Sequence, residues 1–209
     1  EDKSKKNKYF LHLLRFSLIW KLILCAFCIS CINKGLDAWM PTYLIAERGI
    51  NLKAVGYLTP IPFIASFLST AVCGWVMNKY FDKKENWMIV ICAAMTAIFL
   101  YFMYNAETIL WVVIFQCGVY FFKACILGTA VAIVLKIVTG SIAGSASTLI
   151  NMGGQVAGFI SPIIMGYLVY AFHGSFNAVF YYLMGVAALC AISALLIPTR
   201  KEDMLDLEK

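Results

Sequence analysis

Residues 109–135 read ILWVVIFQCGVYFFKACILGTAVAIVL, and Lys123 is the single charged side chain among these 27 residues. A helix needs about 20 apolar residues to cross the ~30 Å hydrocarbon core of a bilayer. Inside lipid, every backbone N–H and C=O group must bond within the protein, and a helix meets this requirement along its own length. The segment therefore predicts a transmembrane helix that carries one lysine near its middle.

Five more apolar segments follow the same pattern in this 209-residue chain, which is 62% hydrophobic and only 13% charged. An average soluble domain has about 45–50% apolar and ~25% charged residues. The composition excludes an ordinary soluble domain, a disordered chain and a nucleic-acid-binding protein with a long basic face. We predict an all-α membrane protein, a bundle of six transmembrane helices in a lipid bilayer. The predicted helices are Ser17–Tyr43, Val55–Met77, Trp87–Tyr104, Ile109–Leu135, Ile142–Tyr170 and Phe176–Ile197.

The positive charges of the chain gather on one side of this predicted bundle. Thirteen of the 17 Lys and Arg residues fall in alternate polar breaks, whereas the breaks on the other side hold only Arg48 and Lys53. Cytoplasmic loops carry an excess of Lys and Arg, so we expect both termini in the cytoplasm. The predicted domains are a cytoplasmic linker at 1–16, a transmembrane domain at 17–197 and a cytoplasmic tail at 198–209. The lysine-rich start, which does not begin with Met, is typical of a linker within a longer protein.

Motifs of enzymes and metal sites are weak in this sequence. The C-x-x-C-x-x-C run that starts at Cys25 has an iron–sulfur spacing, but no fourth Cys followed by Pro comes after it. Cysteines inside an apolar helix usually act as small hydrophobic residues. His12 and His173 lack metal-ligand spacing, and neither is placed to activate a serine in the stretch 145–147. We therefore expect no metal, no cofactor and no enzyme activity.

Charged residues within the predicted helices are the strongest functional signal. A charge at mid-membrane costs at least ~2.5–3.5 kcal/mol, so it indicates a functional site by default. Lys123 lies roughly 20 Å from either end of its helix, too far to reach the membrane surface, and needs a polar cavity or a carboxylate. Gln116 and Tyr120 share its face. Lys34 and Asp37, three residues apart, are expected either to pair with each other or to serve the site. We predict Lys34, Tyr120 and Lys123 as substrate-binding residues.

The fifth predicted helix carries small and polar residues at every third or fourth position from Gly144 to Gly166. One interpretation is close helix packing through small residues. Asn151 and Gln155 favour a second interpretation, because two amides near mid-depth need polar partners. We predict that both contribute to substrate binding.

The six predicted helices fall into kinds that repeat every three. The first and fourth are long and carry Lys at depth, the second and fifth contain Pro60, Pro62 and Pro162, and the third and sixth are plain. Such a pattern indicates a 3+3 inverted repeat. Pro41, after Trp39, predicts a kinked or unwound outer end of the first helix.

Three sequence elements resemble one transporter family. The run Trp39–Leu44 (WMPTYL) resembles the W-x-P-T-Y-L element that ends the seventh helix of the anion:cation symporter family, within the major facilitator superfamily. Residues 61–65 and 144–166 resemble the eighth and eleventh helices of that family. The chain therefore resembles the C-terminal six-helix half of such a transporter. The resemblance implies secondary transport of a small organic anion, a sugar acid or other carboxylate, by alternating access coupled to H+, in a bacterial inner membrane.

The same resemblance assigns further roles. Gly74, Asn78, Asp82 and Lys83 look like the second copy of the superfamily's cytoplasmic gating loop, with Asn78 in place of its first acid. Family members carry their main anion-binding Arg and proton-coupling carboxylate on the N-terminal half, so a missing N-terminal six-helix half is the expected partner. In this chain Lys34 and Asp37 remain the candidates for an ion pair or coupling pair.

Two alternatives stay open. Organophosphate antiporters share the Trp39–Leu44 element and the Cys73-Gly74-Trp75 element, although their phosphate-binding Arg corresponds to Asn33 here. A non-transporting six-helix channel or regulatory subunit is the other alternative.

Overall fold

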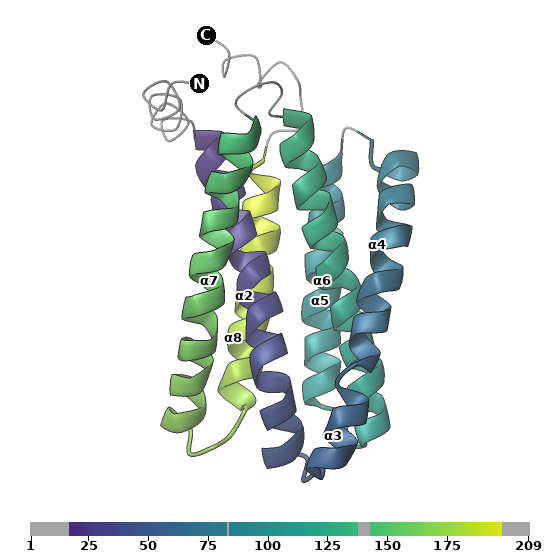
Figure 1. The fold of residues 1–209 in the computed structure, drawn as a ribbon, viewed down its shortest axis with the longest axis vertical. Coiled ribbons are helices and arrows are strands. Elements are labelled where there is room, and N and C mark those ends of the chain that lie inside the picture. Colours follow the sequence, from purple (N-terminus) through teal and green to yellow (C-terminus); the bar gives the residue numbers. More distant parts are fainter. Residues whose placement is uncertain (1–16, 83, 138–142, 198–209) are drawn as a thin grey trace.

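The computed structural model describes residues 17–82, 84–137 and 143–197, and these residues form a bundle of nearly parallel and antiparallel helices (Figure 1). Within this described part, six helical spans are long and apolar enough to cross a membrane, which confirms the prediction. The span Leu52–Tyr80 consists of two helices. The helices are α2 (Ser17–Ala46), α3 (Leu52–Leu58), α4 (Ile61–Tyr80), α5 (Glu85–Tyr104), α6 (Ile109–Ile137), α7 (Ala143–Ala171) and α8 (Asn177–Leu195).

Proline shapes the second span but not the first. Asn51 caps α3 by accepting a hydrogen bond from the Ala54 backbone N–H (2.8 Å), and α4 starts after Pro60, which has no N–H to continue α3. By contrast, α2 continues through Pro41 as far as Ala46, so the unwinding predicted there is not found.

The C-terminal part of α2 is held on two sides, which explains why it stays helical. The Trp39 Nε1–H donates to the Pro162 carbonyl of α7 (3.0 Å). The ring of Tyr43 packs edge-on against Phe176 and Phe180 at centroid distances of 5.4 and 5.2 Å. These tertiary contacts oppose the local tendency of Pro41 to break the helix.

Helix contacts follow the predicted inverted repeat. The helices α2, α7 and α8 pack together on one side and α4, α5 and α6 on the other, while α5 and α8 join the two groups (Figure 1). The most extensive contacts are unchanged when α2 is exchanged with α6, α4 with α7 and α5 with α8. The smaller contact of α7 with α8 does not follow the exchange, because α4 and α5 touch less. Two hydrogen bonds obey the same exchange: Ser161 Oγ of α7 donates to the Cys31 carbonyl of α2 (2.9 Å), and Ser69 Oγ of α4 donates to the Phe121 carbonyl of α6 (2.5 Å).

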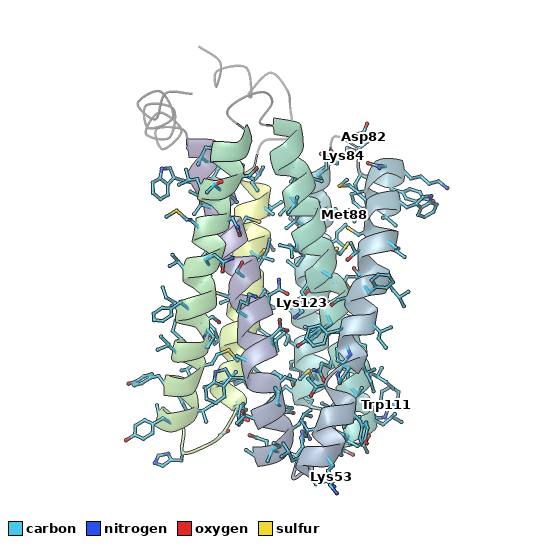
Figure 2. The ribbon with its side chains drawn as sticks, in the orientation of Figure 1. Lys53, Asp82, Lys84, Met88, Trp111 and Lys123 are labelled. Carbon is cyan, nitrogen blue, oxygen red and sulfur yellow. The ribbon has the colours of Figure 1, made fainter. Side chains whose placement is uncertain are left out.

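The helix ends that the sequence assigns to one side of the membrane lie together at one end of the bundle. The start of α2 and the end of α8 lie at one end of the bundle (Figure 1). Asp82 and Lys84 lie at that same end, and Lys53 lies at the opposite end (Figure 2). The predicted linker 1–16 and tail 198–209 lie outside the described residues.

At the end of the bundle near Lys53, polar contacts fasten three helices together. Glu47 Oε2 accepts a hydrogen bond from the Phe176 N–H (3.0 Å), at the start of α8. Arg48 Nε donates to Tyr43 Oη (2.7 Å), and its Nη2 donates to the Tyr104 carbonyl at the end of α5 (3.4 Å). Glu47 thus satisfies a backbone donor at a helix start, where such donors lack a partner within the helix.

We expect Glu47→Ala to lower the midpoint of thermal unfolding in detergent by about 2–4 °C, because a lost cap costs roughly 1 kcal/mol. Glu107, exposed before α6, offers the matched control Glu107→Ala, which should leave the midpoint unchanged. Equal shifts in the two variants would mean that the Phe176 contact adds no stability.

Candidate functional site

An ion pair between α2 and α6 forms the centre of the site. Lys123 Nζ lies 2.9 Å from Asp37 Oδ1, and the Tyr120 hydroxyl donates to the same oxygen at 2.8 Å. The Lys123 side chain is 4% exposed and the Asp37 side chain 34%. Figure 2 shows Lys123 midway along the bundle, between α2 and α6. A carboxylate partner for Lys123 was one of the two environments predicted, and this one is confirmed.

Of the two expectations for Lys34 and Asp37, the geometry does not favour mutual pairing, because Asp37 pairs with Lys123 instead. Asp37 is bound to α6, whereas the aliphatic stem of Lys34 lies across α7 at Gly158. A Cβ atom on Gly158 would come within 3.1 Å of Lys34 Cγ, so the glycine makes room for this path. Within one helix, i and i+3 side chains can meet, but here α6 and α7 draw the two side chains to different neighbours.

The charges around the pair do not cancel. Lys34, which is exposed, adds a second positive charge on α2, three residues before Asp37. Two ammonium groups and one carboxylate leave a net charge of +1 among these three residues. Such a site is suited to an anion.

Close packing through small residues of α7 is observed, whereas substrate binding by Asn151 and Gln155 stays a prediction. A Cβ atom on Gly154 would lie 2.7 Å from Ser30 Oγ of α2, so Gly154 and Gly158 serve close packing between the two helices. Asn151 and Gln155 are exposed, with Gln155 Nε2 at 3.5 Å from Asn151 Oδ1. Among the described residues, no hydrogen bond connects either amide with Lys123 or Tyr120.

Two residues of α4 support Tyr120 and were missed by the sequence analysis. Ser66 Oγ donates to the Tyr120 carbonyl (3.0 Å), and the Phe63 ring packs edge-on against the Tyr120 ring at 5.2 Å. The signal in the sequence was the row Ser66, Ser69 and Cys73, which places small polar side chains on one face of α4. All three donate to backbone carbonyls of α6.

The predicted gating loop is remote from the ion pair. Gly74 and Asn78 are exposed on α4, and Asp82 follows that helix at the end of the bundle (Figure 2). A Cβ atom on Gly74 would meet nothing within 4 Å. Lys83 lies outside the described residues, so a gating role for this loop stays a prediction.

The cysteines contribute to packing. Cys25, Cys28 and Cys31 are each at most 1% exposed in the apolar core, and all eight cysteines of the chain are free thiols. Across the ranges that the structure describes, no group of three or more His, Cys, Asp or Glu side chains is placed to hold a metal ion.

Six membrane spans in a 3+3 inverted repeat, with paired charges at mid-depth, are the architecture of half of a secondary transporter. The chain belongs to the Major Facilitator Superfamily, whose sequence profile matches residues 1–122. It is therefore a multi-pass membrane protein of a transporter family and not an enzyme.

Known relatives are organic-anion transporters. The probable galactarate/D-glucarate transporter of Escherichia coli strain K12 is 26% identical over 179 residues, which cover 82% of this chain and 38% of the relative. The probable sulfoacetate transporter of Cupriavidus necator is 26% identical over 188 residues, 85% of this chain and 43% of the relative. The D-galactonate transporter of Escherichia coli O6:H1 is 23% identical over 165 residues, 76% of this chain and 37% of the relative.

The comparisons confirm the resemblance to a transporter of the anion:cation symporter type. The chain spans about two fifths of the length of these relatives, since the matched regions cover 37–43% of them.

The ion pair makes a prediction for stability. Removing one member of a buried pair leaves an uncompensated charge, which is strongly destabilising, whereas removing both is often nearly neutral. We expect Asp37→Asn to lower the midpoint of thermal unfolding in detergent, and Asp37→Asn combined with Lys123→Met to recover most of the loss. Glu107→Gln is the matched exposed control. Additive losses in the double variant would contradict the pairing.

Proposed function

We propose that this chain forms one wall of the substrate site in a secondary transporter of small organic anions, namely sugar acids or other carboxylates. The observation that carries the proposal is the buried Lys123, held by Asp37 and Tyr120 at mid-depth beside a second cation, Lys34. A bilayer-spanning protein keeps such charges inside the membrane where they serve a solute or ion.

Each side chain has a role that its chemistry supports. Lys34 and Lys123 attract the carboxylate of the substrate. Tyr120, Asn151 and Gln155 supply donors and acceptors for its carboxylate or hydroxyl groups. The relatives named for galactarate, D-glucarate, D-galactonate and sulfoacetate are all named for organic anions, and the first three of these carry hydroxyls next to carboxylates.

Asp37 gives this site a means of coupling to H+. A substrate carboxylate and the Asp37 carboxylate compete for the same donors, Lys123 Nζ and Tyr120 Oη. Protonation of Asp37 removes its negative charge and leaves Lys123 able to bind the substrate anion. Proton and anion therefore enter the site together, which is the requirement for symport.

Alternating access requires a second body that moves against this bundle. We propose that the chain is the C-terminal half, with the transmembrane domain at 17–197 facing an N-terminal six-helix half. The linker 1–16 and tail 198–209 lie in the cytoplasm of a cell with this protein in its inner membrane. Gly74, Asn78, Asp82 and Lys83 form the gating loop on that side.

The test of substrate binding is uptake of labelled D-glucarate, D-galactonate, sulfoacetate and glycerol 3-phosphate into vesicles that contain the transporter bearing this chain. We expect Lys123→Gln to reduce uptake of the carboxylates by about tenfold or more, since a hydrogen bond to a charged group is worth ~1.5–3 kcal/mol. Lys53→Gln, at the exposed end of the bundle, is the control and should retain uptake. Uptake that is unaffected in Lys123→Gln would exclude this site, and preference for glycerol 3-phosphate would favour an organophosphate antiporter.

The test of coupling uses Asp37→Asn, which keeps the shape of the side chain but cannot take up a proton. We expect this variant to exchange labelled for unlabelled substrate across the membrane while losing accumulation driven by an inward proton gradient. The wild-type protein should do both. If Asp37→Asn still accumulates substrate against its gradient, H+ coupling lies elsewhere.

A further inference from the structure

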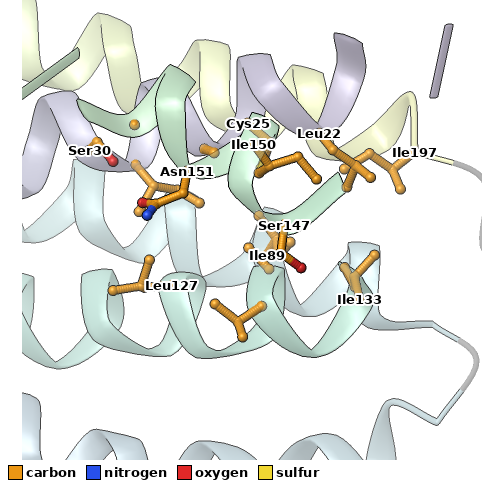
Figure 3. A pocket seen from close by; sticks show the side chains of 15 residues that line it. Leu22, Cys25, Ser30, Ile89, Leu127, Ile133, Ser147, Ile150, Asn151 and Ile197 are labelled. Atoms are coloured by element: carbon orange, nitrogen blue, oxygen red, sulfur yellow. The ribbon is translucent and has the colours of Figure 1, made fainter. Parts of the chain in front are cut away.

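A cavity of about 370 Å³ lies between α2, α5, α6 and α7, in the half of the bundle where α2 begins (Figure 3). This volume falls within the ~300–1,000 Å³ typical of small-molecule pockets. Its walls are mainly aliphatic, with a few hydroxyl and amide groups. Ser30 and Asn151 lie at one end of the cavity, while Leu22, Ile133 and Ile197 lie at the other (Figure 3).

Three helices place the polar end of this cavity near residues of the proposed anion site. On α2, Ser30 in the wall lies four residues from Lys34. On α6, Leu127 lies four residues from Lys123. On α7, Asn151 lies four residues from Gln155. Residues four apart share a helix face about 6 Å along the axis. The cavity therefore begins one helical turn from the proposed anion site on all three helices.

A sugar acid is a poor occupant for the aliphatic end. Each of its carbons between the ends carries a hydroxyl, and burial of hydroxyls against Leu and Ile without hydrogen bonds is unfavourable. An alkyl chain suits the same walls, and each buried CH₂ raises affinity by up to about fourfold.

We propose that this cavity binds the apolar chain of an amphiphilic monocarboxylate whose carboxylate lies at Lys34 and Lys123. This ligand competes with the sugar acid for the two lysines, and it rests on the proposed function for its anionic end. The carboxylate of the ligand suits Lys34, Asp37 and Lys123, which carry a net charge of +1. Its alkyl chain suits the aliphatic walls of the cavity.

The experiment measures how straight-chain carboxylates from butanoate to octanoate inhibit exchange of labelled D-glucarate by the complete transporter. At pH 7.5 these acids are ionised, and exchange needs no proton gradient. We expect the inhibitory concentration to fall by up to about fourfold for each added CH₂. Octanamide, which has the same tail without the charge, should inhibit at least tenfold less than octanoate.

Two cavity variants separate this site from general effects of fatty acids on the bilayer. Ala130→Phe and the smaller change Ala130→Leu fill the cavity from α6, where Ala130 lines the wall. Both should retain exchange of D-glucarate but lose most of the dependence on chain length. Ala94→Phe, at an exposed position of α5 outside the cavity, should behave as the wild type.

An equal dependence on chain length in the Ala130 variants and the wild type would overturn the proposal, because the tails would then act through the lipid. Equal inhibition by octanamide and octanoate would also overturn it. If Lys123→Gln impairs exchange while chain length has no effect in the wild type, the anion site stands and the cavity proposal fails. If exchange is independent of Lys123, the proposed function itself fails.

Discussion

One oxygen atom, Oδ1 of Asp37, connects the two groups of helices at the middle of the membrane. It accepts from Lys123 Nζ and Tyr120 Oη, both on α6. A charge pair removed from water is stable only when its geometry is good and further hydrogen bonds support it. Tyr120 supplies that support, and it is itself held by Ser66 and Phe63 of α4. The contact between α2 and α6 therefore depends on charge, whereas the contacts of α2 with α7 and of α6 with α4 depend on close packing.

Contacts made by packing and the contact made by charge respond differently to a ligand. Gly154, Gly158 and Ser161 bring α7 close to α2 through packing and one hydrogen bond to a backbone carbonyl. The contact between Asp37 and Lys123 is ionic, so in the proposed mechanism a proton or an anion competes directly for one of its partners. In that mechanism the substrate acts on the α2–α6 contact rather than on the packing of α7 against α2, which suits a bundle that moves as a body.

The sequence was sufficient for the spans and for the depth of Lys123, because both follow from hydropathy along one chain. It was insufficient for the partner of Asp37. Spacing places Lys34 near Asp37 on one helix. Which face of α2 points toward α6 depends on packing against α7, where Gly158 leaves space for the aliphatic part of Lys34. Burying Lys123 without a carboxylate costs more free energy than separating Lys34 from Asp37 on the exposed side of α2. The contact between Asp37 and Lys123 is therefore the one that forms. The unwinding expected at Pro41 is absent for a related reason, since the bond from Trp39 to α7 lies beyond any local pattern.

The exposed polar residues place a requirement on the surroundings of this bundle. Lys34, Asn151 and Gln155 lie on spans that cross the membrane, yet their side chains are exposed in the described structure. Lipid tails cannot satisfy these groups, and the cost of leaving them against hydrocarbon is several kcal/mol per charge. These side chains must therefore meet water or another protein surface. A solute bound on this face would lie at a boundary between two bodies, and only at such a boundary can rigid rocking open it first to one side of the membrane and then to the other.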